Sequence, residues 1–323
     1  MIPGIVAGQM RRSGGSGAGV SWTVRSSAAD SGWRSVCWSP ELGLFCAVAF
    51  SGAGARVMTS PDGVTWTARV AAADSGWLSV CWSPERSLFV AVAFSGTGAR
   101  VMTSPDGILW TARAVPEAND FRSVCWSPEL GLFVAVADGG TNRVMTSPDG
   151  INWTARAAPQ AFWTSVCWSP TLGRFVAVAY GSISQFVMTS SDGVTWTARV
   201  AAQNLSWFSV CWSPELGLFV AVASSGTGNR VMTSPNGITW TIRTSAADNN
   251  WGSVCWSPEL GLFVAVANSG TGNRVMTSHD GISWTVRTSA ADNNWMSVCW
   301  SPERSQFVAV AISGTGNRVM TSP

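Results

Sequence analysis

Residues 207–243 read WFSVCWSPELGLFVAVASSGTGNRVMTSPNGITWTIR, and close copies of this stretch follow one another along the whole chain. The anchor SVCWSP occurs seven times, at intervals of 44, 44, 42, 44, 44 and 44 residues. Its cysteines are Cys37, Cys81, Cys125, Cys167, Cys211, Cys255 and Cys299. Self-similarity at a fixed period of this size is typical of architectures in which every copy forms one supersecondary unit.

Each copy holds four short apolar runs, which in residues 207–243 are SVCW, LFVAVA, RVMTS and ITWTIR. Gly, Pro, Asn, Asp or Ser bounds each run, and no segment has the periodicity of a helix. Four strands at this period predict the blade of a β-propeller. The run FVAVA is apolar throughout, as a strand covered on both faces should be, so we expect its valines to face one neighbouring blade and its Phe and Ala the other.

The two ends of the chain predict how the ring closes. The seventh copy stops at Ser322–Pro323, after its third run, and the missing fourth run, GVSWTVR, lies at Gly19–Arg25. We therefore predict an all-β fold, a closed seven-bladed β-propeller with four antiparallel strands per blade, in which the N-terminal strand completes the last blade. The propeller spans residues 16–323 and follows a flexible N-terminal tail at residues 1–15. Closure would remove most exposed strand edges.

Composition narrows the partners and the compartment. The 323 residues carry a net charge of +2 and only 12% are charged, which argues against nucleic acid as a partner. No run of 18 apolar residues occurs, and the N-terminus lacks the apolar core of a signal peptide, so we expect no membrane span. Strands one blade apart rarely bring cysteines within disulfide range. Free cysteines, including Cys46 in place of a valine, favour a cytoplasmic location, and we expect a monomer.

Twenty tryptophans fall at three positions of the repeat: before the first run, inside it and in the fourth run. Large aromatic side chains contribute much of the buried area of a core, so most of these rings should lie between blades. We expect the tryptophan before the first run to be partly exposed, because it ends a polar loop.

The turn between the third and fourth runs reads SPDGVTW at Ser60–Trp66 and recurs in other copies. The recurrences are SPDGILW at Ser104–Trp110, SPDGINW at Ser147–Trp153, SSDGVTW at Ser190–Trp196, SPNGITW at Ser234–Trp240 and SHDGISW at Ser278–Trp284. These motifs resemble the Asp-box, the hairpin signature of sialidase-like (BNR) propellers, shortened by one residue between Asp and Trp. The Asp should cap backbone amides, the Gly should take a positive φ and the Trp should pin the hairpin. The resemblance implies a structural motif away from the ligand face.

The same resemblance raises the question of catalysis. A sialidase implies an arginine cluster for a carboxylate, a Tyr nucleophile with a Glu partner, and an acidic Asp. This chain has one tyrosine, Tyr180, which we interpret as loop drift, and one histidine, His279, which replaces the Pro of a turn motif. The Glu residues of the SPE turns look like solvated charges. We predict no catalytic residue, no metal site and no cofactor, and therefore no enzyme.

Two rings of arginine give the better functional signal. One ring closes the fourth run, at Arg25, Arg69, Arg113, Arg156, Arg199, Arg243 and Arg287. The other opens the third run, at Arg56, Arg100, Arg143, Arg230, Arg274 and Arg318. Both rings should lie on one face with the loops SGTGN and SAADNNW. Guanidinium groups, amides and an exposed aromatic ring suit a glycan or an acidic group. The alternative is that each arginine pairs with a loop Asp, such as Asp74, Asp248 or Asp292, and joins blades.

We therefore interpret the chain as a non-enzymatic propeller that presents multivalent polar pockets and binds a glycan or an acidic group in a lectin-like manner. The predicted ligand-binding residues are Arg56, Arg100, Arg143, Arg230, Arg274, Arg318, Asn229, Asn273, Asn317, Trp207, Trp251 and Trp295. The alternatives are a protein-interaction scaffold, sensitive to the divergent fourth blade around Tyr180 and Phe186, and a sialidase-like glycosidase. The segments Ser209–Trp251 and Ser253–Trp295 differ at five of 43 positions, which indicates recent amplification or design.

Overall fold

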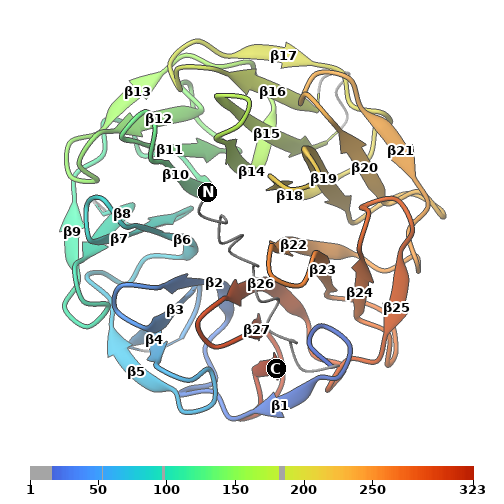
Figure 1. The fold of residues 1–323 in the computed structure, drawn as a ribbon. Helices are drawn as coiled ribbons and strands as arrows, with labels where there is room; N and C mark the ends of the chain where they lie inside the picture. The colour runs from blue at the N-terminus through green and yellow to red at the C-terminus, as the bar shows by residue number, and fades with distance from the viewer. Residues whose placement is uncertain (1–16, 53, 97–98, 182–185) are drawn as a thin grey trace, which may run out of the picture.

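The protein is a ring of seven four-stranded sheets around a central axis (Figure 1). A cavity lined by residues of all seven inner strands lies on this axis, and we call it the central channel. The computed structural model describes residues 17–52, 54–96, 99–181 and 186–323, which form 28 strands. The predicted tail at residues 1–15 lies outside the described residues. In the part of the chain that is described, no helix is long and apolar enough to cross a membrane.

Each sheet is ordered from an inner strand at the channel to an outer strand at the rim. The inner strands are β2 (Trp33–Ser39), β6 (Trp77–Ser83), β10 (Phe121–Ser127), β14 (Phe162–Ser169), β18 (Trp207–Ser213), β22 (Trp251–Ser257) and β26 (Trp295–Ser301). The second strands are β3 (Leu44–Ala49), β7 (Leu88–Ala93), β11 (Leu132–Ala137), β15 (Arg174–Tyr180), β19 (Leu218–Ala223), β23 (Leu262–Ala267) and β27 (Gln306–Ala311).

The third and outer strands complete each blade. The third strands are β4 (Ala55–Ser60), β8 (Val101–Ser104), β12 (Val144–Ser147), β16 (Val187–Ser190), β20 (Val231–Ser234), β24 (Val275–Ser278) and β28 (Val319–Ser322). The outer strands are β1 (Thr23–Arg25), β5 (Thr67–Val70), β9 (Thr111–Arg113), β13 (Thr154–Arg156), β17 (Thr197–Arg199), β21 (Thr241–Arg243) and β25 (Thr285–Arg287). All pairs within a blade are antiparallel, as predicted.

The N-terminal strand completes the seventh blade. Thr23 of β1 lies opposite Thr321 of β28, and Arg25 lies opposite Val319. The blue strand β1 therefore stands beside the red C-terminal strands in Figure 1. The backbone N–H of Gly19 also donates to the Ser322 hydroxyl at 2.7 Å. The predicted closure of the ring is confirmed.

The hydrophobic core is divided among the seven joints between blades. At one joint, Val176 and Val178 of β15 pack with Phe219 and Ala221 of the next blade, and all four are fully buried. The predicted division of FVAVA into a valine face and a Phe/Ala face is therefore confirmed. Small residues of one blade receive large residues of the other, so the joints reach the density of a protein interior.

The tryptophan before each inner strand belongs to this core. Trp207, Trp251 and Trp295 are fully buried, so the expectation that they are partly exposed is wrong. Each indole N–H donates to the carbonyl oxygen of the residue four positions earlier, as Trp251 does to Ala247 at 3.1 Å. The polar loop thus satisfies the one polar atom of the ring, and the rest of the indole can be buried.

The Asp-box-like turn has the expected local geometry. A carboxylate oxygen of Asp62 accepts the backbone N–H groups of Val64 at 2.8 Å and Thr65 at 2.7 Å. Gly63 has a φ of 71°, and the indole N–H of Trp66 donates to its carbonyl oxygen at 2.9 Å. The fourth strand begins after this tryptophan, at Thr67, rather than before it. The backbone N–H groups just before this strand donate to Asp62 in the capped turn, so they are not available to pair with the third strand.

The Glu of each SPE turn is not a free solvated charge, contrary to expectation. It accepts a hydrogen bond from the inner-strand tryptophan of the next blade at 2.6–2.7 Å. The pairs are Trp38–Glu303, Trp82–Glu41, Trp126–Glu85, Trp168–Glu129, Trp256–Glu215 and Trp300–Glu259. The fourth blade has Thr171 instead, and there the buried indole nitrogen of Trp212 has no partner among the described residues.

These contacts define two faces of the ring. We call the mouth face the one that carries the starts of the inner strands, the loop after Ala49 and the loop before Trp77, with their counterparts in the other blades. The turn face is the opposite one, with the SPE turns and the Asp-box-like turns. His279 lies on the turn face, where its exposed ring contacts the carbonyl oxygen of Gly261.

Candidate binding site

The predicted arginine ring at the start of the third strands holds the loops of the mouth face together. The guanidinium of Arg274 donates to the carbonyl oxygens of Gly270 at 2.8 Å and Asn293 at 2.9 Å, and to the Asn294 side chain at 3.0 Å. Asp292 of the following loop lies 3.6 Å away. The N–H donors of this guanidinium group are therefore already used by groups of the protein itself.

The other members of this ring follow the same pattern. The ion pairs to the next loop are Arg56–Asp74, Arg100–Asp120, Arg230–Asp248, Arg274–Asp292 and Arg318–Asp30. Arg143 donates instead to the carbonyl oxygens of Ala161 and Gly140. The alternative in which these arginines join blades is therefore the one seen in the geometry, and their role toward a ligand stays a prediction.

The predicted asparagines and the second arginine ring are also engaged within the protein. Asn273 and Asn317 accept hydrogen bonds from Asn249 and Asn293 of the preceding loops, and Asn229 donates to Gln203. The arginines that close the outer strands donate from Nε to a threonine hydroxyl of the third strand, at 2.9–3.1 Å. Because that threonine belongs to the same blade, this ring does not join blades.

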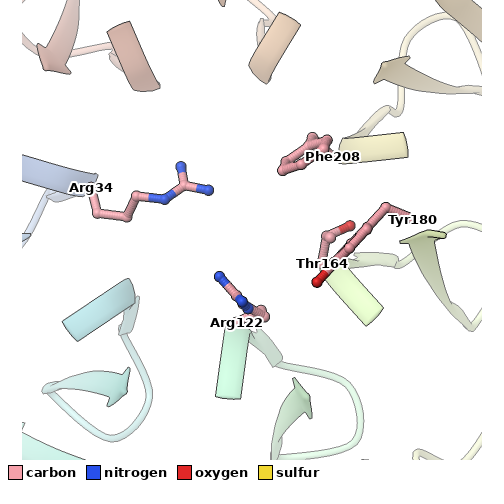
Figure 2. Close-up of a pocket in the computed structure, with 5 residues that line it drawn as sticks. All are labelled: Arg34, Arg122, Thr164, Tyr180 and Phe208. Atoms are coloured by element: carbon pink, nitrogen blue, oxygen red, sulfur yellow. The ribbon is translucent and has the colours of Figure 1, made fainter. Parts of the chain in front are cut away.

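A cavity lies where the inner strands begin, at the mouth of the central channel. Its volume is about 240 Å³. Arg34, Arg122, Thr164, Tyr180 and Phe208 line it, and Figure 2 shows both guanidinium groups pointing inward while Tyr180 and Phe208 stand on the other side. A second, smaller cavity of about 100 Å³ continues around the axis. Of the five lining residues, only Tyr180 was singled out from the sequence, as a marker of the divergent fourth blade.

A β-bulge explains why these side chains reach the axis. In β2 the pairing with β3 skips from Trp33 to Ser35, so Arg34 is the extra residue of the inner strand. The same shift recurs at this point of every inner strand. A bulge re-aims the side chain of its extra residue and ends regular pairing. The repeat therefore presents one side chain per blade to the channel mouth.

A ring of serines supports these side chains. The serine after each bulge accepts a hydrogen bond from a backbone N–H of the next blade at 3.1–3.2 Å. The donor–acceptor pairs are Val36–Ser297, Val80–Ser35, Val124–Ser79, Val166–Ser123, Val210–Ser165, Val254–Ser209 and Val298–Ser253. The invariant serine fixes the blades, which leaves the preceding residue free to vary.

That preceding residue does vary. The bulge positions are Arg34, Leu78, Arg122, Thr164, Phe208, Gly252 and Met296. The residues just after the run FVAVA, or its variant FCAVA, vary as well, and they are Phe50, Phe94, Asp138, Tyr180, Ser224, Asn268 and Ile312. We call these two sets the variable ring. Residues 207–250 and 251–294 differ at six positions, and two of them, 208/252 and 224/268, belong to this ring. The variation at these positions, within an otherwise nearly constant repeat, was the sequence feature from which the site could have been predicted.

Charge is unevenly balanced at the cavity. The Arg122 side chain contacts Asp138 through Nε at 2.6 Å and through Nη2, and it lies over the Phe94 ring at 5.6 Å. Asp138 is only 6% exposed. The half-buried Arg34 donates to the carbonyl oxygen of Met296 at 3.4 Å. Two guanidinium groups and one carboxylate thus meet here, and the cluster carries a net positive charge.

The titration of these groups follows from their surroundings. Burial, together with the positive charge of Arg122, lowers the pKa of the Arg34 guanidinium to about 10. Burial and the nearby Asp138 carboxylate raise the pKa of Tyr180 above its ordinary value. At neutral pH the phenol therefore stays protonated and donates to Asp138 at 3.1 Å.

Aromatic rings form the opposite wall. The rings of Tyr180 and Phe208 are stacked with centroids 5.8 Å apart, and those of Tyr180 and Phe162 are stacked at 5.2 Å. The Arg143 guanidinium covers Phe162 at 5.4 Å. The divergent fourth blade therefore does more than drift, because its tyrosine ties the wall to Asp138. Phe186, by contrast, is fully buried.

Comparison with known proteins shows the fold but no family. No protein-family model matches the chain, and no curated protein matches it. The Asp-box (BNR) class is therefore not established. Among solved structures, YCF48 from Cyanidioschyzon merolae is similar at 15% identity and a TM-score of 0.67, over 93% of this chain and 98% of that chain.

Two further similar structures are enzymes. A streptogramin B lyase matches at 7% identity and a TM-score of 0.77, over 94% of this chain and 97% of that chain. The GH74 enzyme of Niastella koreensis matches at 15% identity and a TM-score of 0.62, over 87% of this chain and 50% of that chain. Propellers of this shape thus include enzymes, but such identities do not extend an activity to this chain.

The chemistry of the described residues sets further bounds. No group of three or more His, Cys, Asp or Glu side chains in the described ranges could hold a metal ion. Tyr180 and His279 lie on opposite faces, at different ends of the strands. At the channel mouth the Tyr180 hydroxyl donates to Asp138, a carboxylate that Arg122 also contacts.

Proposed function

We propose that this propeller is a binding protein that recognises an anionic group of its ligand at the channel mouth. The observation that carries the proposal is the convergence of Arg34 and Arg122 on one cavity, where Asp138 is the carboxylate seen to pair with Arg122. Guanidinium groups bind carboxylate, sulfate and phosphate oxygens through paired N–H donors. A ligand anion would supply the negative charge that this cluster lacks.

The walls of the cavity suggest what carries the anion. Phe208 and Tyr180 offer ring faces, and the Thr164 hydroxyl stands beside them. A cavity of about 240 Å³ is smaller than the roughly 300–1,000 Å³ of sites for drug-sized ligands. It suits a terminal group, such as an acidic sugar at the end of a glycan or a carboxylate on a planar stem, rather than a whole large ligand.

The variable ring supports recognition as the function. Residues that maintain the blades are copied from unit to unit, whereas those around the cavity differ. Selection or design for seven equivalent pockets would keep these positions alike. Their divergence instead favours one composite site per chain, built from different side chains. The proposed site is thus a single pocket on the axis, in place of repeated pockets at the arginine ring.

The test is a binding screen followed by titration. The screen would use a glycan array with sialylated and sulfated glycans, together with an aromatic carboxylate and inorganic phosphate. Titration calorimetry of the hits should give a stoichiometry of one per chain. Replacing Arg34 by Met, which the seventh blade carries at the equivalent position, should weaken binding by about 10- to 100-fold, as expected for loss of about 1.5–3 kcal/mol from a charged hydrogen bond.

A matched control separates local chemistry from net charge. Arg86 lies on the turn face, where most other blades carry Leu, so Arg86→Leu removes the same charge away from the cavity. This variant should bind like the unaltered protein. Equal losses of affinity for Arg34→Met and Arg86→Leu would contradict the proposed site. A stoichiometry above one per chain that is lost when the arginines at the start of the third strands are replaced would also contradict it, and would favour the multivalent alternative.

A further inference from the structure

Cys46 is the one cysteine that departs from the repeat. The equivalent residues in the other blades are valines: Val90, Val134, Val176, Val220, Val264 and Val308. In the register of the first blade, Cys46 of β3 stands directly opposite Cys37 of β2. In the other blades the anchor cysteine faces a valine, as Cys81 faces Val90.

Directly opposite residues of an antiparallel pair project to the same side of the sheet. Their Cα atoms lie about 4.5–5.5 Å apart, and their Cβ atoms lie at a similar separation. Disulfides span Cα distances of about 4.4–6.8 Å. Cys37 and Cys46 also pack against the same cluster around Trp77 and Phe89 of the next blade. The register of the first blade thus places the Cα atoms of Cys37 and Cys46 at a separation that a disulfide can span.

Both thiols are free in the structure, and they differ in access. Cys46 is fully buried, whereas Cys37 is half-buried on the innermost strand, beside the channel. A small reagent can therefore reach Cys37 first. Anchor cysteines of adjacent blades belong to separate sheets and lack this direct pairing.

We propose that Cys37 and Cys46 form a disulfide bond when the protein meets a small organic disulfide. The Cys37 thiolate attacks one sulfur of the reagent RSSR, which forms a Cys37–SR mixed disulfide and releases one RS⁻. The Cys46 thiolate then attacks the Cys37 sulfur and expels the second RS⁻. The reagent takes up two electrons, and the two thiol protons end on the released groups as two RSH.

Burial slows this reaction but does not prevent it. Desolvation raises the pKa of both thiols above the ordinary value, and for Cys37 the nearby Cys46 adds to the effect. Only the thiolate is nucleophilic, so the exchange should be slow at neutral pH and accelerate as the pH rises toward 9. A rate that falls with increasing pH would argue against thiolate attack.

The spacing of arginines makes the test direct. Trypsin cleaves after Arg34 and Arg56, and the chain has no lysine, so the peptide Ser35–Arg56 holds these two cysteines and no other. The folded protein would be treated with cystamine, its remaining thiols blocked after denaturation, and the digest analysed without reductant. We expect peptide Ser35–Arg56 to lack two hydrogens and to take no label. Each other anchor cysteine is half-buried like Cys37 but has no thiol opposite it, so it can lose its label only to a mixed disulfide that adds one cysteamine.

Two variants taken from the repeat itself provide controls. Cys46→Val restores the residue of the other blades and removes the second attacking thiol, so the exchange at Cys37 should stop at the mixed disulfide, seen as one cysteamine added to peptide Ser35–Arg56. Val90→Cys recreates the pair in the second blade and should remove two further thiols by linking Cys81 to residue 90. A fully labelled peptide Ser35–Arg56 in the treated protein would overturn the proposal, as would a link between Cys37 and Cys81.

Discussion

The mouth face and the turn face are built from the same repeat, yet they use its repetition in opposite ways. On the turn face the same contact is made in blade after blade, as in the pairs Trp82–Glu41 and Trp300–Glu259. On the mouth face the bulge positions share a place and differ in chemistry, from Arg34 to Gly252. Repeated contacts therefore join the blades, by the Trp–Glu pairs on the turn face and by the Arg–Asp pairs among the mouth-face loops, whereas departures from repetition at the channel mouth create the candidate site.

The largest expected effect comes from opening the ring on which both faces depend. Deleting residues 1–26 removes β1 and exposes the edge of β28, which would be free to pair with other chains. We expect loss of the folded monomer, by aggregation or by loss of a cooperative melting transition. Size-exclusion chromatography and thermal melting would measure it.

A shorter deletion serves as its control. Removal of residues 1–15 leaves β1 in place, so this variant should stay monomeric with an unchanged melting temperature. If the longer deletion behaved in the same way, the N-terminal strand would not be needed to hold the ring closed.

The second prediction separates the two faces. Glu259→Thr copies the fourth blade and removes the acceptor of the buried Trp300 indole. Leaving such a donor unsatisfied costs about 1–3 kcal/mol, so the free energy of unfolding in urea should fall by that amount. Ligand affinity at the mouth should be unchanged, whereas Arg34→Met should lower affinity and leave stability alone. A variant that altered both quantities would break the distinction between the faces.

The converse change should stabilise the protein. Thr171→Glu would give the orphaned Trp212 nitrogen the carboxylate that the other inner-strand tryptophans have. We expect a gain of about 1 kcal/mol, seen as a rise of about 2 °C in melting temperature. Thr171→Gln introduces a side chain of similar length to Glu but without the charge, and it should raise the stability by less. No gain from either variant would mean that the joint between the fourth and fifth blades cannot accommodate the bridge.

The smallest effect concerns the charge of the Asp-box-like turns. Burial pushes the pKa of Asp280 upward, but the backbone N–H groups of Ser283 and Ile282 and the Ser278 hydroxyl outweigh it, so the pKa lies below its ordinary value. A lowered folded-state pKa means stability that is present above the unfolded pKa, near pH 4, and is lost as pH falls through the folded value.

Asn236 shows how to measure this contribution. It accepts the same two backbone bonds as Asp280 without a titrating group. Asp280→Asn should therefore cost about 0.5 kcal/mol or less at pH 7, because solvent screens the exposed carboxylate, and the difference should shrink below pH 3. Urea unfolding at both pH values would show it. A difference that grew on acidification would reverse the sign assigned here.

The sequence alone predicted what depends on local pattern. Strand number, the closure by Gly19–Arg25, and the packing of valines against Phe and Ala all follow from periods of two and 44 residues. The capped turn at Asp62 follows from its own motif. These features need only neighbours in the chain or in the same repeat.

What the sequence did not reveal depends on contacts between blades. Glu41 meets its indole partner 41 residues away, across a joint, so nothing beside it in the chain marks it as an acceptor. Arg34 reaches the axis through a bulge that the apolar pattern does not encode. Trp251 is buried because its loop carbonyl turns back to satisfy it. In each case the decisive partner is set by three-dimensional geometry.

The closure by β1 also bears on where the chain termini can lie in the ring. Residues Gly17 and Ser322 touch, with the Ser322 hydroxyl 3.3 Å from the Gly17 carbonyl oxygen. A direct link from Pro323 to Ala18 would read SPAGVSW, which differs from the turn SPDGVTW of the first blade at two side chains. The chain termini could therefore lie at the turn between the third and fourth strands of any of the seven blades. A circularly permuted chain opened at any of the other six turns would present the same variable ring, in the same cyclic order, from a different starting blade.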